Sequence, residues 1–442
     1  MSGTRQLMRA LPARRSAAAG TASKSAGELY AVYADGSGKV LDLPWLAPAV
    51  DGGVVRRGRP EDFIALPPGT LLLVLPGRRP IAFEGAAQVA YEPADGTQAC
   101  AVGAALPLGY TRTLLPAYSE QPNAPTLPLY GYAAVAWSAA GLRVAAVATD
   151  DLAQWRSDAH GEAEVRRAIA RRTRELADTP LLRQLTRCAL DYGCYTAQNS
   201  FLGRGEAAIP VSASCNARCI GCISAQQPDA GIESAHQRLS AVPAPEEIAS
   251  FAVGHLTAGK NSIVSFGQGC EGEPLLAAPR IAAAIALIRE RTARGTIHCN
   301  TNGSRPKALA MLLDAGLESV RVSINSARAD RYTAYYRPRG YRFQDVVNSL
   351  EVAQNYGAAI SLNLLTHPGV TDDPPEMEAL AALLRKRRIS MVQTRTLNID
   401  PARYFSVVGR PQSQPVGMRD WLAWMHREFP AVRIGNFTRG FG

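Results

Sequence analysis

The regular alternation of strand-like and helix-like segments between residues 208 and 400 constrains the fold of this chain more than any other feature. Short apolar runs recur there, each with a length typical of a β-strand. The runs are Ile209–Ser212, Ser262–Phe266, Thr296–Asn300, Val320–Ile324, Ala359–Leu364 and Ser390–Thr394. Helical patterns begin between them, near Glu246, Arg280, Lys307, Phe343 and Glu376. Strands that are separated by helices predict an α/β fold with a parallel sheet or an incomplete barrel.

A loop with three cysteines follows the first of these strands. It lies in the stretch AIPVSASCNARCIGCI, residues 208–223, and contains Cys215, Cys219 and Cys222. Three thiols this close together indicate a metal site, yet structural zinc sites and ordinary iron-sulfur clusters take four protein ligands. The nearest histidine, His236, lies fourteen residues further on. A [4Fe-4S] cluster with three thiolates keeps one iron open to an outside ligand; a structural zinc loop and an electron-transfer cluster are the alternatives.

The spacing Cys-x3-Cys-x2-Cys after a strand resembles the signature of the radical S-adenosylmethionine (SAM) enzymes. The resemblance implies that the three cysteines hold a [4Fe-4S] cluster whose open iron chelates the amino and carboxylate groups of SAM. One electron then cleaves SAM to methionine and a 5′-deoxyadenosyl radical, which takes a hydrogen atom from a substrate. The implied fold is a partial (β/α)6 barrel with the cluster after its first strand. One position departs from the family pattern, because Gly221 stands where an aromatic residue is usual.

A second element, Gly272, Glu273 and Pro274, follows the second strand and resembles the family's Gly-Gly-Glu element. The resemblance implies that its backbone carbonyls and the Glu273 carboxylate accept hydrogen bonds from the ammonium group of SAM. In such folds the chemistry gathers at the carboxyl ends of the strands. Polar residues at the other strand ends are therefore the implied cofactor-binding residues: Asn300, Ser323, Asn325, Asn363 and Arg395.

Composition limits the location and the partners of the protein. The chain has 442 residues, of which 47% are hydrophobic, but no apolar run approaches the roughly 18 residues of a membrane helix. Eight cysteines in a chain of this length do not form the even framework of a small secreted domain, and a reducing cytoplasm is expected. The net charge of +10 permits an anionic partner such as nucleic acid or a phosphorylated substrate, or simply reflects a basic surface.

The expected parts of the chain follow from changes in pattern. Residues 1–27 are basic, lack acidic side chains and predict a disordered tail rather than an organellar presequence. Residues 28–150 contain short apolar runs cut by Gly and Pro, which predict a small β-rich domain. Residues 151–207 are expected to form a helical connector with a helical pattern from Glu162 to Tyr192, and residues 208–400 the radical SAM core. Residues 401–442 are expected to form a C-terminal extension with one amphipathic helix, around Met418 to Glu428.

The sequence therefore predicts a radical SAM enzyme that acts on an unidentified small molecule or peptide. The family implies flavodoxin or ferredoxin as the electron donor, while the catalytic residues for the substrate stay unknown. An RNA-modifying radical enzyme and a non-catalytic zinc or iron-sulfur protein are the alternatives; nucleic acid is possible but not favoured. The segment Tyr332–Tyr341 either faces the substrate or packs its rings on the barrel edge. Four cysteines outside the loop leave a second cluster open: Cys188, Cys194, Cys270 and Cys299.

Overall fold

A computed structural model describes residues 13–16, 25, 27–150 and 160–440. Most of the predicted basic tail, residues 1–27, therefore lies outside the described residues. The chain divides into two compact units. The first contains residues 1–149, 366–377 and 396–428, and the second contains residues 150–365, 378–395 and 429–442. The domain boundaries expected from the sequence stay a prediction.

The second unit is built around a parallel sheet whose strand order follows the chain. Its strands are β16 (Glu206–Ile209), β17 (Ile263–Phe266), β18 (Thr296–Thr301), β19 (Ser319–Ile324), β20 (Ala359–Thr366), β21 (Met391–Thr396) and β22 (Arg433–Gly435). The registers of β16 to β20 in turn, and of β21 with β22, are all parallel. The predicted α/β partial barrel is thus confirmed, and β22 adds a short strand that the sequence did not predict.

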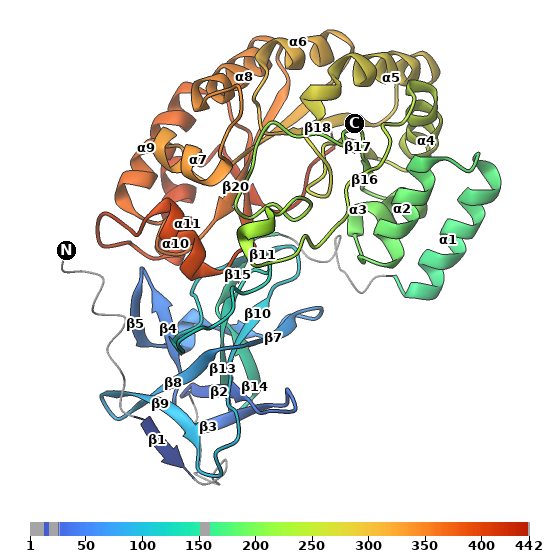
Figure 1. The fold of residues 1–442 in the computed structure, drawn as a ribbon. Coiled ribbons are helices and arrows are strands. Elements are labelled where there is room, and N and C mark those ends of the chain that lie inside the picture. Colours follow the sequence, from blue (N-terminus) through green and yellow to red (C-terminus); the bar gives the residue numbers. More distant parts are fainter. Residues whose placement is uncertain (1–12, 17–24, 26, 151–159, 441–442) are drawn as a thin grey trace. The chain divides into compact units, whose positions relative to one another are not determined.

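Helices alternate with these strands and cover one side of the sheet. They are α4 (Pro245–Ala258), α5 (Ala278–Arg291), α6 (Pro306–Asp314), α7 (Ala329–Tyr336), α8 (Phe343–Asn355) and α9 (Pro374–Lys386). Figure 1 shows α4, α5, α6 and α8 as an arc outside the strands, and successive members of this arc contact each other. Such an outer layer requires an apolar face on the sheet beneath it.

Strand β19 shows how the sequence divides the two faces of the sheet. Val320, Val322 and Ile324 are fully buried, whereas Arg321 and Ser323 alternate with them. Because side chains alternate along a strand, the apolar set faces the helices and the polar set faces the interior of the sheet. The neighbouring strand continues this polar face, since Ser323 pairs in register with Asn363. The face of the sheet towards the interior is therefore polar, and the face towards the helices is apolar.

The first strand of this sheet lies earlier in the chain than predicted. The expected strand was Ile209–Ser212, but β16 ends at Ile209. Pro210 follows it and has no N–H for a strand ladder. The backbone N–H groups of Val211 and Ser212 instead donate to the carboxylate of Glu271 at 2.6 and 2.7 Å. An apolar pattern alone does not distinguish a strand from a loop that is held by a side chain.

The helical connector consists of three helices. They are α1 (Glu162–Glu175), α2 (Pro180–Leu190) and α3 (Tyr195–Leu202). The sequence predicted one helical stretch from Glu162 to Tyr192, but the chain breaks before Pro180. Thr179 caps α2 by accepting a hydrogen bond from the N–H of Leu182, 3.2 Å away. Proline at the first helical position after such a cap is favourable, so the break is encoded locally.

The first unit confirms the predicted β-rich N-terminal domain. Its strands are β1 (Ala13–Ser16), β2 (Tyr30–Ala34), β3 (Val40–Leu46), β4 (Pro48–Asp51), β5 (Val54–Arg57), β6 (Ile64–Ala65), β7 (Leu71–Leu75), β8 (Arg78–Glu84), β9 (Ala87–Pro93), β10 (Ala101–Ala105), β11 (Tyr110–Arg112), β12 (Tyr118–Glu120), β13 (Ala133–Ser138), β14 (Gly141–Val144) and β15 (Ala146–Ala148). Most of the described pairs are antiparallel, and β2 with β3, β4 with β5, β8 with β9 and β13 with β14 join successive strands. The turn between β13 and β14 pairs Ser138 with Gly141. Only β1 with β9 is parallel among the described pairs of this unit.

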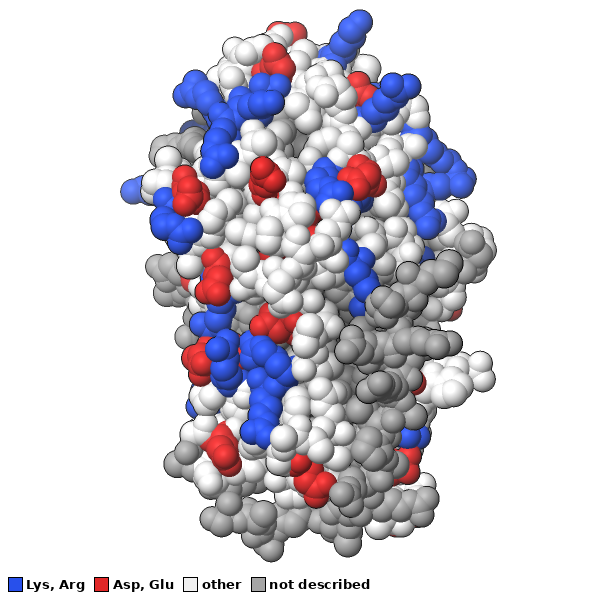
Figure 2. All heavy atoms as spheres, turned by 90° about the vertical axis from the view of Figure 1, so that its left-hand side faces the viewer, with Lys and Arg blue, Asp and Glu red and all other residues white. Residues whose placement is uncertain are grey.

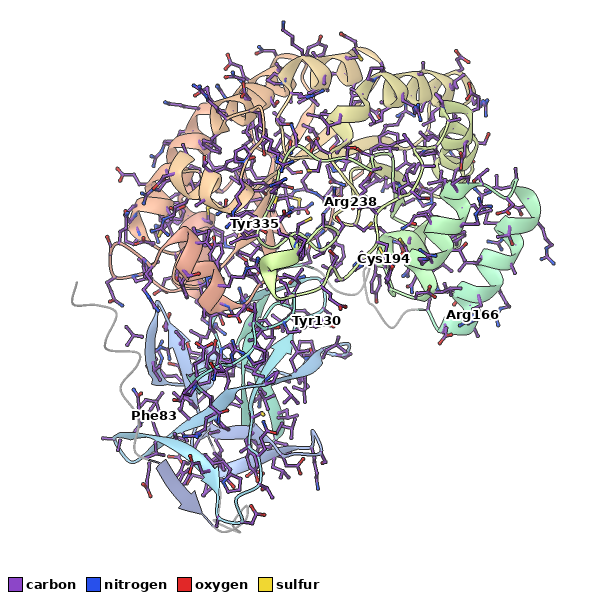
Figure 3. The ribbon with its side chains drawn as sticks, viewed as in Figure 1. Phe83, Tyr130, Arg166, Cys194, Arg238 and Tyr335 are labelled. Atoms are coloured by element: carbon purple, nitrogen blue, oxygen red, sulfur yellow. The ribbon has the colours of Figure 1, made fainter. Side chains whose placement is uncertain are left out.

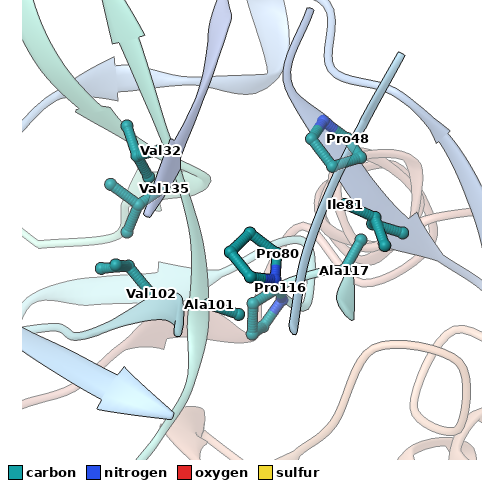
Figure 4. Close-up of a pocket in the computed structure, with 9 residues that line it drawn as sticks. All are labelled: Val32, Pro48, Pro80, Ile81, Ala101, Val102, Pro116, Ala117 and Val135. Carbon is teal, nitrogen blue, oxygen red and sulfur yellow. The ribbon is translucent and has the colours of Figure 1, made fainter. Parts of the chain in front are cut away.

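A small apolar cavity lies between the strands of this unit (Figure 4). Its volume is about 20 Å³, and Val32, Val102 and Val135 are among the residues that line it. A cavity of this size holds one water molecule at most. It is therefore a packing defect and not a ligand site.

Two later segments of the chain complete the first unit. They carry α10 (Pro401–Val408) and α11 (Met418–Glu428), the latter with the bounds expected for the amphipathic helix. Asp400 precedes α10 and accepts a hydrogen bond from Arg78 at 2.9 Å. Both side chains are about 2% exposed, so this ion pair is buried between segments that are far apart in the sequence.

The surface carries charges of both signs. In the view of Figure 2, Lys and Arg side chains are interspersed with Asp and Glu side chains. Several of the basic residues form ion pairs, such as Arg289 with Glu318 and Arg387 with Glu351. Among the described helices, none has both the length and the apolar character that a membrane crossing requires.

Candidate functional site

The cysteine loop is hydrogen-bonded to the C-terminal end of α7. Its backbone N–H groups at Arg218 and Ile220 donate to the carbonyls of Tyr336 and Tyr335, at 2.9 and 3.1 Å. The last carbonyls of a helix lack partners within the helix, so a neighbouring loop can use them. The N–H of Arg339 adds a third bond, to the carbonyl of Asn216 at 2.8 Å. The segment after β19 thus fixes the middle of the cysteine loop.

The tyrosines of α7 pack within the second unit. Tyr332 is fully buried, and its ring stacks on that of Tyr336 with the centroids 4.3 Å apart. Its hydroxyl lies 3.1 Å from that of Tyr341. Of the two interpretations of this segment, ring packing is the one that the structure bears out. This segment contributes to the site through its backbone, which forms hydrogen bonds with the cysteine loop. The aromatic residues in its sequence do not reveal these backbone bonds.

The loop after β17 is hydrogen-bonded to the start of the cysteine loop. The N–H of Gly272 donates to the carbonyl of Ser212, and the N–H of Glu273 to that of Ser214, both at 2.7 Å. A Cβ atom at Gly272 would lie 1.9 Å from the oxygen of Ser214. Only glycine permits this approach of two backbones. The structure therefore brings the two sequence elements together, one residue before Cys215.

Glu271 is a functional residue that the sequence interpretation missed. Its buried carboxylate accepts the two bonds from Val211 and Ser212, and a third from the N–H of Gln268 at 2.8 Å. Burial raises the pKa of Glu271 to about 7, although the backbone donors oppose that shift. The available signal was an acidic residue inside a loop that directly follows a buried strand.

Glu273 uses its carboxylate within the chain. It accepts hydrogen bonds from the hydroxyl of Thr301, from the N–H of Asn302 at 2.8 Å and from that of Leu275 at 3.0 Å. Only 3% of Glu273 is exposed, and burial raises its pKa to about 7. Glu273 thus ties the loop after β17 to the end of β18, and its neighbour Pro274 begins a short 3-10 helix (Pro274–Ala277).

An amide pair extends this contact to the cysteine loop. The Nδ2 of Asn302 donates to the Oδ1 of Asn216 at 2.9 Å, and the Nδ2 of Asn216 donates to the hydroxyl of Ser304 at the same distance. Asn302 stood near the end of a predicted strand, but nothing in the sequence pointed to Asn216. The cysteine loop is consequently held from three sides: α7, the loop after β17 and the end of β18.

The three thiols of the loop are partly exposed and close enough to affect one another's charge. Burial raises the pKa of Cys215 to about 11 and raises that of Cys219 as well, and in both cases the Cys222 thiol adds to the shift. The guanidinium of Arg238 lies beside Cys222, with Nη2 3.6 Å from its Sγ, and also donates to the hydroxyl of Ser224 (Figure 3).

This donor set fits an iron-sulfur cluster. In a [4Fe-4S] cube each thiolate binds a different iron, so the sulfurs stand farther apart than the ligands of one ion. Within the described part of the chain, no three His, Cys, Asp or Glu side chains converge as a single metal ion requires. Cysteine thiolates are the ligands that iron-sulfur clusters take, and this loop supplies three of them.

The predicted residues on the interior face of the sheet form one pair. Ser323 on β19 accepts a hydrogen bond from the Nδ2 of Asn363 on β20 at 3.0 Å. Both residues are partly exposed, whereas the Oδ1 of Asn363 is buried without a hydrogen-bond partner among the described residues. On the next strand Arg395 is also partly exposed, and its Nη2 lies 3.5 Å from the Oε1 of Gln393. These residues make up the accessible polar part of the interior.

Two predicted residues are buried and bonded within the sheet instead. Asn300 is 7% exposed, donates to the carbonyl of Phe266 at 3.2 Å and pairs its Oδ1 with His298 at 2.9 Å. Asn325 is 2% exposed, and its Nδ2 donates to the carbonyl of Arg331 at 3.3 Å. Asn300 and Asn325 are thus bonded to the backbone and buried, whereas Ser323 and Asn363 are partly exposed.

A charged network lies on the same interior face. Arg321 donates to Gln393 and to Thr438, both at 2.7 Å, and lies 3.6 Å from the carboxylate of Glu206. Burial alone would raise the pKa of Glu206, but Arg321 and neighbouring donors, including Ser265, lower it to about 2. The network is therefore ionised at neutral pH, and sequence patterns gave no sign of it.

Comparison with known proteins agrees with this geometry. The family model described as the Radical SAM superfamily matches residues 209–381, which include the cysteine loop and most of the sheet. The GTP 3',8-cyclase of Listeria monocytogenes serotype 4b is 32% identical over 170 residues, which are 37% of this chain and 46% of that protein. The GTP 3',8-cyclase of Chlorobaculum tepidum is 27% identical over 185 residues, 41% and 51% of the two chains.

Among solved structures, methylornithine synthase aligns with a TM-score of 0.36 at 15% identity, over 63% of this chain and 76% of the other. The matched region spans about half the length of the two cyclases. By this match, residues 209–381 carry a radical SAM domain.

Proposed function

We propose that this chain is a radical SAM enzyme that acts on a small-molecule or peptide substrate. The observation that carries the proposal is the loop of Cys215, Cys219 and Cys222, held by backbone hydrogen bonds at the polar side of a parallel sheet inside the family match. A [4Fe-4S] cluster and SAM, which this family uses, would supply a 5′-deoxyadenosyl radical that abstracts hydrogen from the substrate. The three cysteines would hold the cluster.

In this proposal the chain's own residues position the loop and line the interior. Glu271 and the bonds from Gly272 and Glu273 fix the backbone before Cys215, and the carbonyls of α7 fix it before and after Cys219. Such a shell keeps ligands within the narrow limits that catalysis requires. We expect these bonds to hold the three thiols in position for the cluster.

The residues implied as SAM contacts divide by exposure. Ser323, Asn363 and Arg395 are partly exposed, and we expect them to contact SAM or the substrate directly. Glu273, Asn300 and Asn325 are buried, and we expect them to act by holding the strand ends. Gly272 and Pro274 are expected to shape the loop after β17. The Oδ1 of Asn363, which has no partner among the described residues, suits a donor such as a ribose hydroxyl or an ammonium group.

The charge of the interior supports an anionic group on the substrate or on SAM. Arg321 and Arg395 lie on this face, and Glu206 provides a carboxylate for Arg321. A guanidinium at the edge of a polar interior binds a carboxylate or a phosphate through two parallel hydrogen bonds. The substrate in the name of the two cyclase relatives is not assigned to this chain, because the match covers about half of each of those proteins. Flavodoxin or ferredoxin is the proposed electron donor.

The test is anaerobic reconstitution with iron and sulfide, followed by incubation with SAM and dithionite and an assay for 5′-deoxyadenosine. The wild type is expected to form the nucleoside, and Cys219→Ala is expected to form none. Cys100→Ala is the matched control, because Cys100 is a buried cysteine of the first unit. Binding of SAM to the reduced cluster should also change its electron paramagnetic resonance spectrum. Zinc in place of iron, with no such spectrum, would contradict the proposal.

A further inference from the structure

Exposed basic residues lie on the segments that hold the cysteine loop. The three segments, residues 214–219, 303–307 and 335–342, belong to the second unit and contain no Asp or Glu. Asn216 joins them, because its side chain donates to the hydroxyl of Ser304 at 2.9 Å and its carbonyl accepts the N–H of Arg339 at 2.8 Å. Six exposed side chains on these segments make up what we call the basic patch: Arg218, Arg305, Lys307, Arg337, Arg339 and Arg342.

The charges of the basic patch are not balanced by acids of the chain. Within the described residues none of the six side chains forms a salt bridge. Exposed arginines elsewhere in the second unit do have acidic partners, such as Arg166 with Glu162 and Arg183 with Asp178. Like charges that gather without counter-charges repel one another, whereas an anionic partner would be attracted to them. The basic patch is therefore a surface for a negatively charged partner.

The aromatic rings beside these arginines are not available to such a partner. Tyr335, Tyr336 and Tyr341 are all buried. Proteins that bind single-stranded nucleic acid combine positive charge with exposed rings on which the bases stack. Positive charge without exposed rings suits the acidic surface of another protein better than it suits nucleic acid.

The basic patch adjoins the residues that are proposed to hold the cluster. Asn216 directly follows Cys215, and Arg218 directly precedes Cys219. The N–H of Arg218 donates to the carbonyl of Tyr336, the residue before Arg337, at 2.9 Å. A protein bound to the basic patch would therefore stand next to the cysteine loop. Electron transfer between two proteins requires such a close approach, because its rate falls steeply with distance.

We propose that the basic patch is the docking surface for a small acidic carrier protein that delivers one electron to the cluster. This inference rests on the proposed function and assigns the electron donor to a particular surface. One electron passes from the reduced carrier to the cluster, the carrier is oxidised by one electron, and no bond forms or breaks. Complexes of this kind are small and transient, so attraction between charges determines how often they form.

The first experiment measures docking without catalysis. Fluorescence anisotropy of a dye-labelled flavodoxin, an acidic flavin protein, is followed as the full chain is added at low ionic strength. We expect saturable binding that weakens as sodium chloride is raised, because salt screens exposed charges.

The test variant combines Lys307→Gln, Arg337→Asn and Arg342→Gln, and it is expected to bind flavodoxin at least about tenfold more weakly. The backbone bonds to the cysteine loop come from Arg218 and Arg339, so these two residues are left in place. Asparagine is chosen at position 337 because it tolerates the left-handed backbone there, where φ is +48°.

A second triple variant on α1 is the matched control. Arg167→Gln, Arg171→Gln and Arg174→Gln remove the same amount of charge from a helix that also carries Glu164 and Glu175, and wild-type affinity is expected. Equal weakening by the two triple variants would overturn the proposal, because net charge alone would then attract the carrier. Failure of the wild type to bind flavodoxin at low salt would overturn it as well. Transfer RNA that binds the wild type, is lost in the test variant and is not displaced by flavodoxin would overturn it in favour of nucleic acid.

The second experiment separates docking from SAM chemistry. The reconstituted protein forms 5′-deoxyadenosine with either reduced flavodoxin or dithionite as the electron source. With limiting flavodoxin the test variant is expected to be at least about tenfold slower than the wild type, and with dithionite, which needs no docking surface, equally fast. Equal rates with flavodoxin would contradict the proposal. No nucleoside from the wild type with dithionite would count against the proposed function instead, and the binding experiment would still decide the docking surface.

Discussion

Single atoms decide the geometry at the cysteine loop. Gly272 has no side chain, and this permits its backbone to lie against that of Ser214. Glu271 supplies a carboxylate to two successive N–H groups, those of Val211 and Ser212, just beyond the end of β16. Such contacts are worth little individually, but an error of about 1 Å in a cofactor ligand has large effects on function.

Replacement of Gly272 by alanine tests the close approach. The added Cβ would meet a backbone oxygen, which no rotamer change relieves, so the two loops must separate. We expect a loss of about 1–3 kcal/mol in the free energy of unfolding and a lower iron content after reconstitution. Gly161→Ala is the matched control, because that glycine has φ of −78° and nothing within 4 Å of a new Cβ. Equal iron contents in the two variants would contradict this role of Gly272.

At the scale of elements, helix ends organise both units. The carbonyls at the end of α7 hold the cysteine loop, and the start of α10 is capped by Asp400. Asp400 accepts bonds from the N–H of Ala402, from that of Leu127 and from Arg78, at 2.9, 2.8 and 2.9 Å. One carboxylate thus caps a helix, anchors a loop and neutralises a buried arginine, all within the first unit.

Asp400→Asn is therefore expected to destabilise the first unit strongly. An amide cannot neutralise Arg78, and removing one partner of a buried ion pair costs about 3–5 kcal/mol. Unfolding by urea, followed through tryptophan fluorescence, reports on this unit, which contains Trp45, Trp137, Trp421 and Trp424. Glu120→Gln removes the other carboxylate of Arg78, but Glu120 is 45% exposed, so at most about 1 kcal/mol should be lost. Similar effects of the two substitutions would contradict the argument.

At the scale of the whole molecule, the two units have different kinds of core. The first is a set of antiparallel strands around small apolar clusters, completed by segments from the C-terminal part of the chain. The second keeps a buried network of charges on the interior face of its sheet, where Arg321 and Glu206 lie on nonadjacent strands. A buried ion pair of this kind makes stability depend on pH.

The stability of the second unit should fall in acid because of Glu206. Its pKa is lowered to about 2 from its ordinary value of 4.5, so its contribution is complete above pH 4.5 and is lost as the pH falls towards 2. Glu206→Gln should cost about 3–5 kcal/mol at pH 7, and the difference from the wild type should shrink between pH 4.5 and 2. The measurement is urea unfolding of the metal-free full chain, followed by far-ultraviolet circular dichroism.

The control for this measurement is a surface ion pair of the same unit. Glu351 pairs with Arg387 at 2.7 Å but is 51% exposed, so Glu351→Gln should cost no more than about 1 kcal/mol at any pH. A difference between Glu206→Gln and the wild type that stays constant down to pH 2 would show that the carboxylate is not ionised in the folded protein.

The sequence by itself determined the α/β architecture and the cysteine loop. Strand and helix periods are local properties, and three thiols within eight residues are close in any fold. The β-rich N-terminal domain followed from the same kind of evidence, because Gly and Pro punctuate its short apolar runs. The amphipathic pattern of α11 gave its bounds, whereas the break before α2 and the early end of β16 were missed.

Only the tertiary structure decided which side chains meet. Glu271 and Asn216 carry no local pattern, and their partners lie some 60 and 86 residues away along the chain. The same holds for Arg78 and Asp400, whose pairing depends on how distant segments pack. Local periodicity fixes what each segment becomes, because it reflects interactions between near neighbours. Long-range contacts depend on the three-dimensional arrangement of all the segments, and a single sequence does not record them.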